Sequence, residues 1–314
     1  MQRRPFSSRA LGLALGVLAD VAFGDPRRGH PVAVFGSAAA RLERWWWADR
    51  RGPGVAYAGV LVGGAVAGGV LAERLVARHA VVRAVLTAAA TWAVLGGTSL
   101  AGEGAAMAAS LEAGDLAAGR ARLPHLCGRD PSSLDADGLA RAALESVAEN
   151  TADAVVAPLV WGAVAGVPGL LGHRAVNTLD AMVGHRSPRY LQFGWAAARL
   201  DDLVNWVPAR VSGAAAAGWA PMVGGSRELA LRAVADGAGR HPSPNAGVVE
   251  AAFAGALDVR LGGRNIYDGQ AEDRGELGTG RAAEIADITR ANRLAAAVSI
   301  TGLLVAVLVR MVRR

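Results

Sequence analysis

The central part of the chain reads RAALESVAENTADAVVAP (141–158), then HRAVNTLDAMVGHR (173–186) and FGWAAARLDDLVN (193–205). Each segment places carboxylates and carboxamides within runs of Val, Ala, Leu, Trp and Gly. Polar side chains among apolar helices are costly to keep in a membrane, and those that occur usually serve function. We therefore expect this stretch to carry the functional site of a helical membrane protein.

The acids of the first segment follow a helical spacing. Glu145, Glu149 and Asp153 are four residues apart, which stacks them on one helix face with a drift of about 40° per step. The pattern recurs at spacings of three or four in Asn177 with Asp180 and Asp201 with Asn205.

Composition favours a membrane protein over a soluble domain. Of the 314 residues, 52% are hydrophobic and 19% are charged, whereas soluble domains carry nearer a quarter charged residues. The net charge is +6, and all 33 cationic side chains are arginine. Because apolar runs separate these arginines, we expect anionic lipid head groups and phosphorylated ligands, and no nucleic acid. A single cysteine, Cys127, rules out a disulfide within the chain.

We predict an all-α, polytopic integral membrane protein with about five spanning or partly embedded helices. The chain is expected to form one unit, 1–314. The candidate spans are 10–23, 55–72, 81–101, 154–172, 203–222 and 294–309, and the polar site segments are 128–153, 173–205 and 240–287. Run 10–23 is read as a short retained helix because it lacks a good cleavage site.

The helix that carries Glu145 begins at a cap, Asp135 or Asp137. Its acidic face can hold Mg²⁺, which prefers oxygen ligands, or can position an amine. The ordinary alternative is a solvated stripe with an Arg141–Glu145 pair, worth about 0.2–0.5 kcal/mol. We favour the functional interpretation because the face runs directly into the apolar sequence AVVAPLVWGAVAGV.

Arginines stand beside the acids of the later segments. A guanidinium group binds phosphate through two parallel hydrogen bonds, so Arg186, Arg189 and Arg199 suit a phosphorylated substrate. Interhelical ion pairing at the membrane surface is the commoner role for any single arginine. The loop at 240–247 adds His241, Ser243 and Asn245, and Asn245 is the expected N-cap of a helix from Ala246 to Leu257. An anion can also bind at such a helix start.

The sequence lacks the common signatures of nucleotide and metal enzymes. It has no GxxxxGK[ST], no GxSxG, no HExxH and no paired CxxC, and it contains no lysine. If a nucleotide binds, it does not bind on a P-loop.

Five ordered segments resemble the adenosylcobinamide-phosphate synthase (CobD/CbiB) family, integral membrane proteins of the late corrin pathway. The segments are LADVAFGDPRRGHPVAVFG (18–36), GRDPSSLDADGLARAALESVAENTADAVVAPLVWG (128–162), HRAVNTLDAMVGHRSPRYLQFGWAAARLDDLVNWVPAR (173–210), HPSPNAGVVEAAFAGALDVRLGG (241–263) and NIYDG (265–269). The chain departs from the family pattern at Ala154, His185 and Gly275, and none of these changes removes an acid or amide from the central stretch.

The resemblance implies ATP-dependent amide formation. A side-chain carboxylate of adenosylcobyric acid is joined to aminopropanol phosphate, or to aminopropanol, and the product is adenosylcobinamide (phosphate). ATP is the implied co-substrate, Mg²⁺ the implied cofactor and the corrinoid the substrate. The implied location is the inner (cytoplasmic) membrane, as a multi-pass protein in contact with lipid and with neighbouring corrin-pathway enzymes.

The residue roles are our own hypothesis. The expected metal ligands are Glu149, Asp153 and Asp201, and Glu145 or His241 is the expected acceptor of the amine's proton. The expected catalytic residues are Glu145, Glu149, Asn150, Asp153, Asp180, Asp201, Asp202 and His241. The expected substrate-binding residues are Asp25, His30, Asn177, Arg186, Arg189, Arg199, Asn205, Ser243 and Asn245.

Two other functions compete with the ligase. An intramembrane prenyltransferase also gathers acids around Mg²⁺, but it would show repeated Asp-rich motifs, and only Asp201-Asp202 hints at one. A corrinoid transporter or binding protein would suit broken helices with polar residues at mid-membrane. A prenyl diphosphate requirement would identify the first, and transport without a new bond would identify the second.

Overall fold

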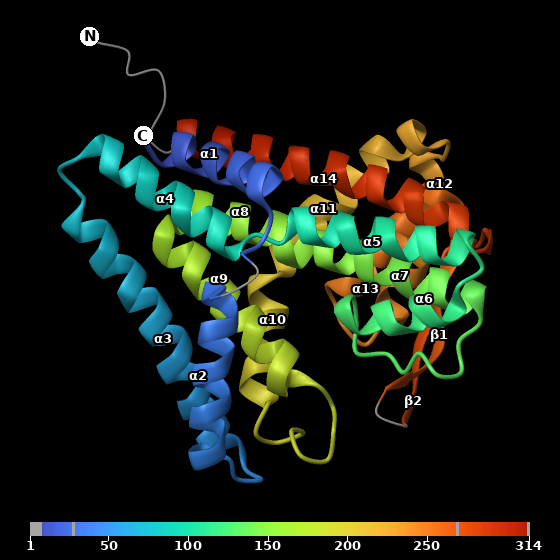
Figure 1. Ribbon diagram of the computed structural model, residues 1–314, viewed down its shortest axis with the longest axis horizontal. Helices are drawn as coiled ribbons and strands as arrows, with labels where there is room; N and C mark the ends of the chain where they lie inside the picture. The colour runs from blue at the N-terminus through green and yellow to red at the C-terminus, as the bar shows by residue number, and fades with distance from the viewer. Residues whose placement is uncertain (1–7, 27–28, 268–269, 313–314) are drawn as a thin grey trace. The chain divides into compact units, whose positions relative to one another are not determined.

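The computed structural model describes residues 8–26, 29–267 and 270–312 of the chain. The described chain is mostly helical, and its internal contacts divide it into two compact units (Figure 1). The first unit comprises 1–96, 157–205 and 302–314, and the second comprises 97–156 and 206–301. Each unit therefore combines segments that are distant in the sequence.

The regular elements described in the first unit are helical. They are α1 (Ser8–Phe23), α2 (Pro31–Trp46), α3 (Arg51–Leu75), α4 (Ala80–Val94), α8 (Ala157–Ala165), α9 (Val167–Leu179), the π-helical turn η3 (Asp180–Gly184) and α10 (Trp195–Val204). Helix α1 packs along α4, and α3 packs along α9. The rings of Tyr57 and Phe193, 5.1 Å apart, lie in a buried cluster that includes Leu179 and Val183. This cluster fixes α3 and α10 beside the polar turn that follows α9.

The second unit contains helices and a small sheet. Its helical elements are α5 (Gly97–Glu112), α6 (Leu116–Arg122), η1 (Leu123–His125), α7 (Ala136–Thr151), the π-helical turn η2 (Ala152–Val156), α11 (Trp206–Trp219), η4 (Ala220–Val223), α12 (Arg227–Gly237), η5 (Ala238–Arg240), α13 (Ala246–Leu257) and α14 (Ile285–Val312), whose last residues belong to the first unit. Helix α7 is capped as predicted, because Gly138 N–H donates to Asp135 Oδ1 at 2.8 Å.

Helix α13 lies at the centre of this unit. It packs against α7, α11, α12 and β1, and every one of its residues except Val248 is buried. A helix that is apolar on all sides is a buried helix. Its twelve residues span about 18 Å, well short of the ~30 Å hydrocarbon core of a bilayer. We therefore treat α13 as the core of a folded unit and not as a membrane span.

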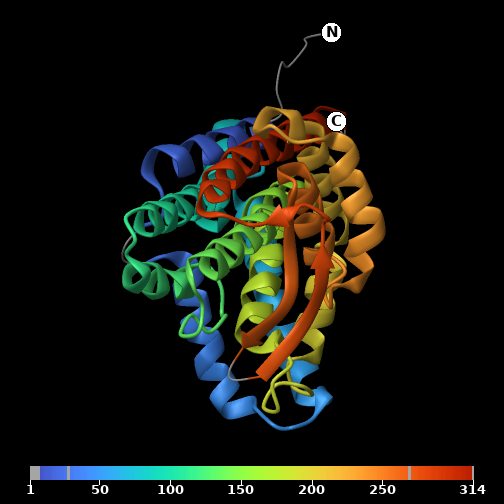
Figure 2. The same cartoon turned by 90° about the vertical axis from the view of Figure 1, so that its right-hand side faces the viewer.

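The sheet is the main departure from the predicted all-α fold. Strands β1 (Val259–Tyr267) and β2 (Gln270–Leu277) pair antiparallel, and β3 (Arg281–Ala282) pairs parallel with β1. Figure 2 shows β1 and β2 as the two long orange-red arrows. The dipeptide Asp268-Gly269, which lies outside the described residues, is a recognised hairpin signal. The prediction missed this signal because the segment is otherwise polar and rich in glycine and arginine.

Three described helical segments are long and apolar enough to cross a membrane. They are Arg51–Leu75, Ala80–Glu112 and Ile285–Val312, by length and composition. They overlap the predicted runs 55–72, 81–101 and 294–309. The second of these segments consists of α4 and α5 with a short break at 95–96. Of the other three candidates, α1 has 16 residues, run 154–172 breaks at Gly166 and run 203–222 breaks at Asn205, and none of them meets the length and hydropathy of a span. The membrane character is thus supported, while the number of spans stays a prediction.

The close approach of α3 to the residues just before α10 gives a test of this packing. A Cβ added at Gly54 would lie 1.8 Å from the carbonyl oxygen of Phe193, whereas one added at Gly59 on the same helix meets nothing within 4 Å. We expect Gly54→Ala to destabilise the protein by about 1–3 kcal/mol. Gly59→Ala should be neutral or slightly stabilising, because alanine is the better helix former. Thermal unfolding in detergent measures both, and equal melting temperatures would contradict the packing.

Candidate active site

Glu145 is the anchor of a buried ionic cluster in the second unit. Its carboxylate forms an ion pair with Arg129, and both side chains are almost completely buried. The Gly262 N–H donates a second hydrogen bond to Glu145 Oε1 at 2.7 Å. Glu145 thus ties α7 to the loop before it and to β1, and both of its oxygens are engaged.

The Arg141–Glu145 pair considered from the sequence does not form. Arg141 instead donates to the Gly262 carbonyl and, at 3.2 Å, to Asn265 Oδ1. These contacts place a cation beside β1, a strand that the sequence did not predict. The solvated-stripe alternative is therefore wrong for Glu145.

Glu149 lies one turn further along α7 and differs from Glu145 in having no hydrogen bond to its carboxylate from any described residue. Burial raises its pKa, the charge of Arg274 opposes this, and the charge of Glu145 adds to it. A partly buried acidic group with a raised pKa and no hydrogen bond from the described residues is a candidate for ligand binding.

Asn150 is held by its own helix. Its Nδ2 donates to the Ser146 carbonyl at 2.9 Å and to Ser146 Oγ at 3.0 Å, and Ser146 Oγ donates to the Leu126 carbonyl at 2.6 Å. These bonds use the amide N–H groups and leave the amide oxygen as the group able to bind a ligand. Asn150 therefore stays a candidate through that oxygen alone.

The two predicted acids Asp153 and Asp180 both lie in π-helical turns. Asp153 is in η2, directly after α7, and Asp180 begins η3, directly after α9. A π turn adds a residue to the helical repeat, which rotates the side chains that follow, and such turns occur often at functional sites. The four-residue stacking of Glu149 and Asp153 expected for an ideal helix therefore does not apply across this junction.

The two π turns share a sequence pattern that the prediction from sequence missed. Residues 150–156 read NTADAVV and residues 177–183 read NTLDAMV, so both follow Asn-Thr-x-Asp-Ala-x-Val. The threonines bond alike: Oγ1 of Thr151 donates to the Val147 carbonyl at 2.6 Å, and Oγ1 of Thr178 donates to the Arg174 carbonyl at 2.7 Å. Each unit therefore contains one copy of the same local structure, with one acid in it.

The loop before α13 places His241 in the second unit's core. His241 Nδ1 accepts the N–H of Ser243 at 3.0 Å, and its Nε2 lies 3.6 Å from Glu250 Oε1. Helix α13 begins where predicted, but its cap is Ser243, whose Oγ accepts the N–H of Ala246 at 3.2 Å. The Asn245 side chain makes no capping bond, and its Oδ1 instead accepts from Arg210 at 2.8 Å. The predicted Asn245 cap is therefore wrong.

Glu250 is a candidate residue that was not predicted from the sequence. It is the charged side chain of α13, it is 0% exposed, and both of its oxygens lack a hydrogen bond within the described structure. Burial raises its pKa well above the ordinary value, and the charges of Glu145 and Glu149 raise it further. A lone acid in the apolar run VVEAAFAGAL (248–257) was the available signal.

In the first unit, His30 and Asp25 form a small polar pair. His30 caps α2, because its Nδ1 accepts the N–H of Val32 at 3.2 Å, and its Nε2 lies 3.5 Å from Asp25 Oδ1. His241 is used in the same way in the second unit, with one nitrogen on a backbone N–H and the other facing an acid. The structure thus brings Asp25 and His30 together, and their role in substrate binding stays a prediction.

A second polar chain in this unit runs from α9 to α10. His173 Nε2 lies 2.8 Å from Asn205 Oδ1, and Asn205 Nδ2 donates to Asp201 Oδ2 at 2.9 Å. His173 is buried, which lowers its pKa to about 4 and keeps the ring neutral. Asp201 and Asn205 are therefore brought together as predicted, and Asn177 receives a long contact from Arg174 at 3.5 Å.

The predicted phosphate-binding arginines have ordinary partners or face solvent. Arg189 donates to Glu43 at 3.0 Å and stacks on Trp47, with its guanidinium carbon 4.6 Å from the ring centre. Arg199 pairs with Asp202 at 3.3 Å, and Arg186 is exposed. Burial raises the pKa of Asp202, and the charges of Arg199 and Arg186 oppose it. Phosphate binding by Arg186, Arg189 and Arg199 stays a prediction.

The predicted metal ligands are divided between the units. Glu149 and Asp153 belong to the second unit and Asp201 to the first. In the described part of the chain, no group of three or more His, Cys, Asp or Glu side chains is placed to hold a metal ion. Mg²⁺ bound with a nucleotide needs only one or two protein carboxylates, because phosphate oxygens and water complete its shell. The oxygen donors of Glu149 and Asp153 are chemically suited to that arrangement.

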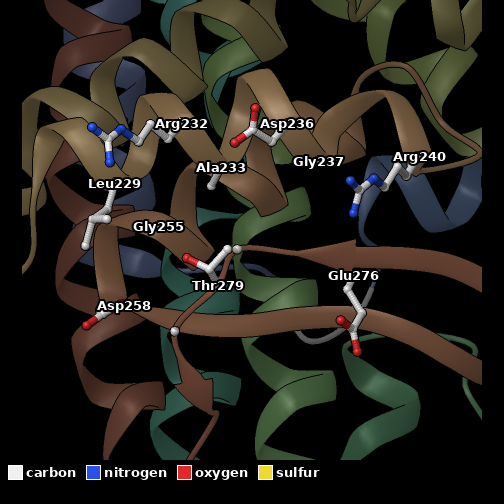
Figure 3. A pocket seen from close by; sticks show the side chains of 12 residues that line it. Leu229, Arg232, Ala233, Asp236, Gly237, Arg240, Gly255, Asp258, Glu276 and Thr279 are labelled. Carbon is white, nitrogen blue, oxygen red and sulfur yellow. The ribbon is translucent and has the colours of Figure 1, made fainter.

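A separate pocket of about 470 Å³ opens between α12, η5 and the strands of the second unit. Figure 3 shows Arg232, Asp236 and Arg240 on one side, with Asp258, Glu276 and Thr279 opposite. The pocket thus presents both charge signs to a small ligand. None of the residues predicted for the site lines it.

Comparison with known proteins identifies a family that matches most of the chain. The family model described as CobD/Cbib protein matches residues 13–295. A protein of Mycobacterium tuberculosis strain H37Rv named cobalamin biosynthesis protein CobD is 55% identical over 286 residues, covering 91% of both chains. A Rhodobacter capsulatus protein of the same name is 44% identical over 263 residues, covering 81% of this chain and 82% of the relative. No solved structure matches the chain.

Proposed function

The chain belongs to the CobD/Cbib family, and from that premise we propose that it acts in cobalamin biosynthesis as an ATP-dependent amide ligase. It joins a side-chain carboxylate of adenosylcobyric acid to aminopropanol phosphate or aminopropanol, and it releases adenosylcobinamide (phosphate). Relatives in two distant bacteria, aligned over more than four-fifths of the chain, are named cobalamin biosynthesis proteins, which supports the pathway.

The observation that carries the reaction class is the buried ionic cluster of the second unit. Glu145 is satisfied by Arg129 and Gly262, while Glu149 and Glu250 take no hydrogen bond from any described residue. Glu250 is a buried carboxylate, which is costly to leave without a partner, and Glu149 is partly buried with a raised pKa. Their retention favours a role in binding or proton transfer. Amide formation needs both, since a carboxylate must be activated and an amine must lose a proton.

In this proposal Glu149 and Asp153 would hold Mg²⁺ for ATP, and the role of Asp201, which belongs to the first unit, stays a prediction from the sequence. When bound, the ion neutralises phosphate charge and polarises the phosphoryl group. The protein's own part is to present the carboxylate oxygens. Glu149 lies on α7, and Asp153 lies in the π turn η2 that follows this helix.

The remaining predicted residues bind substrate. Arg186, Arg189 and Arg199 contribute positive charge for a phosphate. Other polar side chains supply hydrogen bonds to the substrate. They are the amide and hydroxyl groups of Asn150, Asn177, Asn205, Ser243 and Asn245, together with Asp25, His30, Asp180 and Asp202. Arg186 supports this role best, because it is exposed and makes no ion pair with a described acid.

We place the protein in the cytoplasmic membrane as a multi-pass protein. Three segments of spanning length support membrane insertion, and ATP is available only on the cytoplasmic side. The polar segments 128–153, 173–205 and 240–287 therefore face the cytoplasm. Single-cysteine labelling that places Asn150 or Asp201 outside the cell would contradict this orientation.

The direct test is product formation by purified membranes. Adenosylcobyric acid, ATP and Mg²⁺ are mixed with either aminopropanol or its phosphate, and mass spectrometry follows the amide. We expect an amide whose formation stops when ATP is omitted, and the faster amine identifies the natural substrate. Product that requires a prenyl diphosphate, or corrinoid uptake into vesicles without a new bond, would replace the ligase with one of the other two functions.

A further inference from the structure

The second unit contains a buried pair, Glu250 with His241, that no other feature of the fold explains. The two side chains are 0% and 1% exposed, and the Glu250 Oε1 and His241 Nε2 atoms are 3.6 Å apart. Within the described structure neither oxygen of Glu250 has a hydrogen-bond partner. Leaving a buried carboxyl without a partner costs stability, whereas a leucine at this point of an apolar helix would not.

His241 is oriented by its backbone contact. His241 Nδ1 lies 3.0 Å from the backbone nitrogen and 3.2 Å from the carbonyl oxygen of Ser243, so this backbone segment fixes the ring whichever nitrogen carries the proton. Burial lowers the pKa of His241 to about 4, so the ring is neutral near pH 7. Its Nε2 faces Glu250 Oε1 at 3.6 Å and has no hydrogen-bond partner among the described residues.

Four charged side chains from three parts of the second unit influence Glu250. Glu145 and Glu149 lie on α7, Arg129 on the loop before it and Arg274 on β2. Burial raises the pKa of Glu250 most, the two acids raise it further, and the two arginines oppose them. A carboxylate with a raised pKa binds a proton more strongly than a surface glutamate and is the stronger base.

Glu145, which the sequence suggested as the base, is already occupied. Its oxygens accept from Arg129 and from the Gly262 N–H. Among the acids of this cluster, Glu250 has two oxygens without a hydrogen bond in the described structure and a fixed imidazole beside one of them. Its isolation from bulk water also suits ligation, because water competes with the amine for an activated carboxylate.

We propose that Glu250 is the catalytic base that takes the proton lost by the amine as the amide forms, and that His241 is the positioning residue that holds its carboxylate. In this step an N–H bond of the substrate ammonium breaks and its electron pair stays on nitrogen. The proton passes to Glu250, which becomes a neutral carboxylic acid, and the free amine attacks the activated carboxyl. The new C–N bond replaces the C–O bond to the activating phosphate, which leaves with the second proton of the amine. This inference rests on the proposed ligase function.

The test compares Glu250→Gln and Glu250→Asp with Glu228→Gln, a matched change at an exposed glutamate of α12. We expect Glu250→Gln to lower kcat by roughly 10²–10⁴-fold with little change in KM for the amine. Glu250→Asp should recover part of the rate, and Glu228→Gln should match the wild type. The wild-type rate should fall on acidification through the Glu250 pKa, and the residual Glu250→Gln rate should lack that dependence.

A stability measurement separates this role from a structural one. Because the folded-state pKa of Glu250 is raised, its contribution to stability is full below about pH 4.5 and is lost as pH rises through the folded pKa. Glu250→Gln should therefore melt at or above the wild-type temperature at alkaline pH, so its low rate cannot be due to unfolding. Wild-type product with an unchanged kcat for Glu250→Gln would overturn the inference alone. No wild-type product would overturn the ligase proposal, and the inference with it.

Discussion

Removing one predicted magnesium ligand in the second unit is expected to reduce amide formation by about 10²–10³-fold, the usual cost of losing one preorganised electrostatic contact in a transition state. The changes are Glu149→Gln and Asp153→Asn, which keep side-chain size and remove the negative charge. The loss should be greatest at limiting Mg²⁺ and smaller at high Mg²⁺, because a weakened site fills again by mass action. Initial rates across a Mg²⁺ titration measure both effects.

The matched control is Glu112→Gln, at an exposed glutamate near the end of α5. It should leave the rate and its Mg²⁺ dependence unchanged. Wild-type turnover by Glu149→Gln and Asp153→Asn at limiting Mg²⁺ would remove both residues from the metal site. A reduced rate with an unchanged Mg²⁺ dependence would assign them a role other than metal binding.

Breaking the Arg129–Glu145 pair is expected to have the largest effect on stability. Both side chains are buried, at 2% and 4% exposed, so Arg129→Met leaves an uncompensated carboxylate in the core. Loss of one partner of a buried pair typically costs about 3–5 kcal/mol. Glu145→Gln alone should cost less than Arg129→Met, since the glutamine oxygen can still accept from Gly262 N–H. The double variant should be more stable than the sum of the two single changes predicts.

Arg232→Met provides the control for this cycle. Arg232 pairs with Glu228 at 2.6 Å, but both side chains are about two-thirds exposed. Exposed pairs contribute under about 1 kcal/mol, so this change should barely shift the melting temperature. Similar losses from Arg129→Met and Arg232→Met, measured in the same detergent, would contradict the buried cluster.

The parts of the fold that the sequence predicted are those set by local composition. Long apolar runs around 55–72 and 294–309 lie within helices of spanning length because hydropathy and helix length are local properties. The start of α13 at Ala246 was predicted for a similar reason, from two prolines and a polar residue before an apolar run. The division into two units was not predicted, since it depends on contacts between segments far apart in the chain.

The sequence supplied candidate site residues but not the contacts that these residues make in the fold. Spacing placed Glu145, Glu149 and Asp153 on one face, but the π turn at 152–156 changes the helical repeat before Asp153. Helical spacing offered Arg141 as a partner of Glu145 only in the solvated-stripe alternative, and in the structure Arg141 donates to Gly262 of the unpredicted strand β1. Arg129, sixteen residues before Glu145 in a loop, takes that place.

Glu250 escaped prediction because spacing patterns single out clusters of acids. Only the fold shows that α13 is buried on nearly all sides and that the Glu250 carboxyl has no hydrogen-bond partner among the described residues. The repeated Asn-Thr-x-Asp-Ala-x-Val pattern was visible in the sequence, and only the matching π turns show that it encodes a shared structure. Lone acids in apolar helices therefore merit the same attention as acidic clusters.

The central claim is that ATP activates a corrinoid carboxylate for attack by an amine. The most direct measurement uses adenosylcobyric acid labelled with ¹⁸O in its free carboxylate, together with ATP, Mg²⁺ and the preferred amine. If the carboxylate is activated as an acyl phosphate, one ¹⁸O per amide formed must appear in the phosphate released from ATP. Amide formation with no ¹⁸O transferred to any product of ATP would contradict the claim.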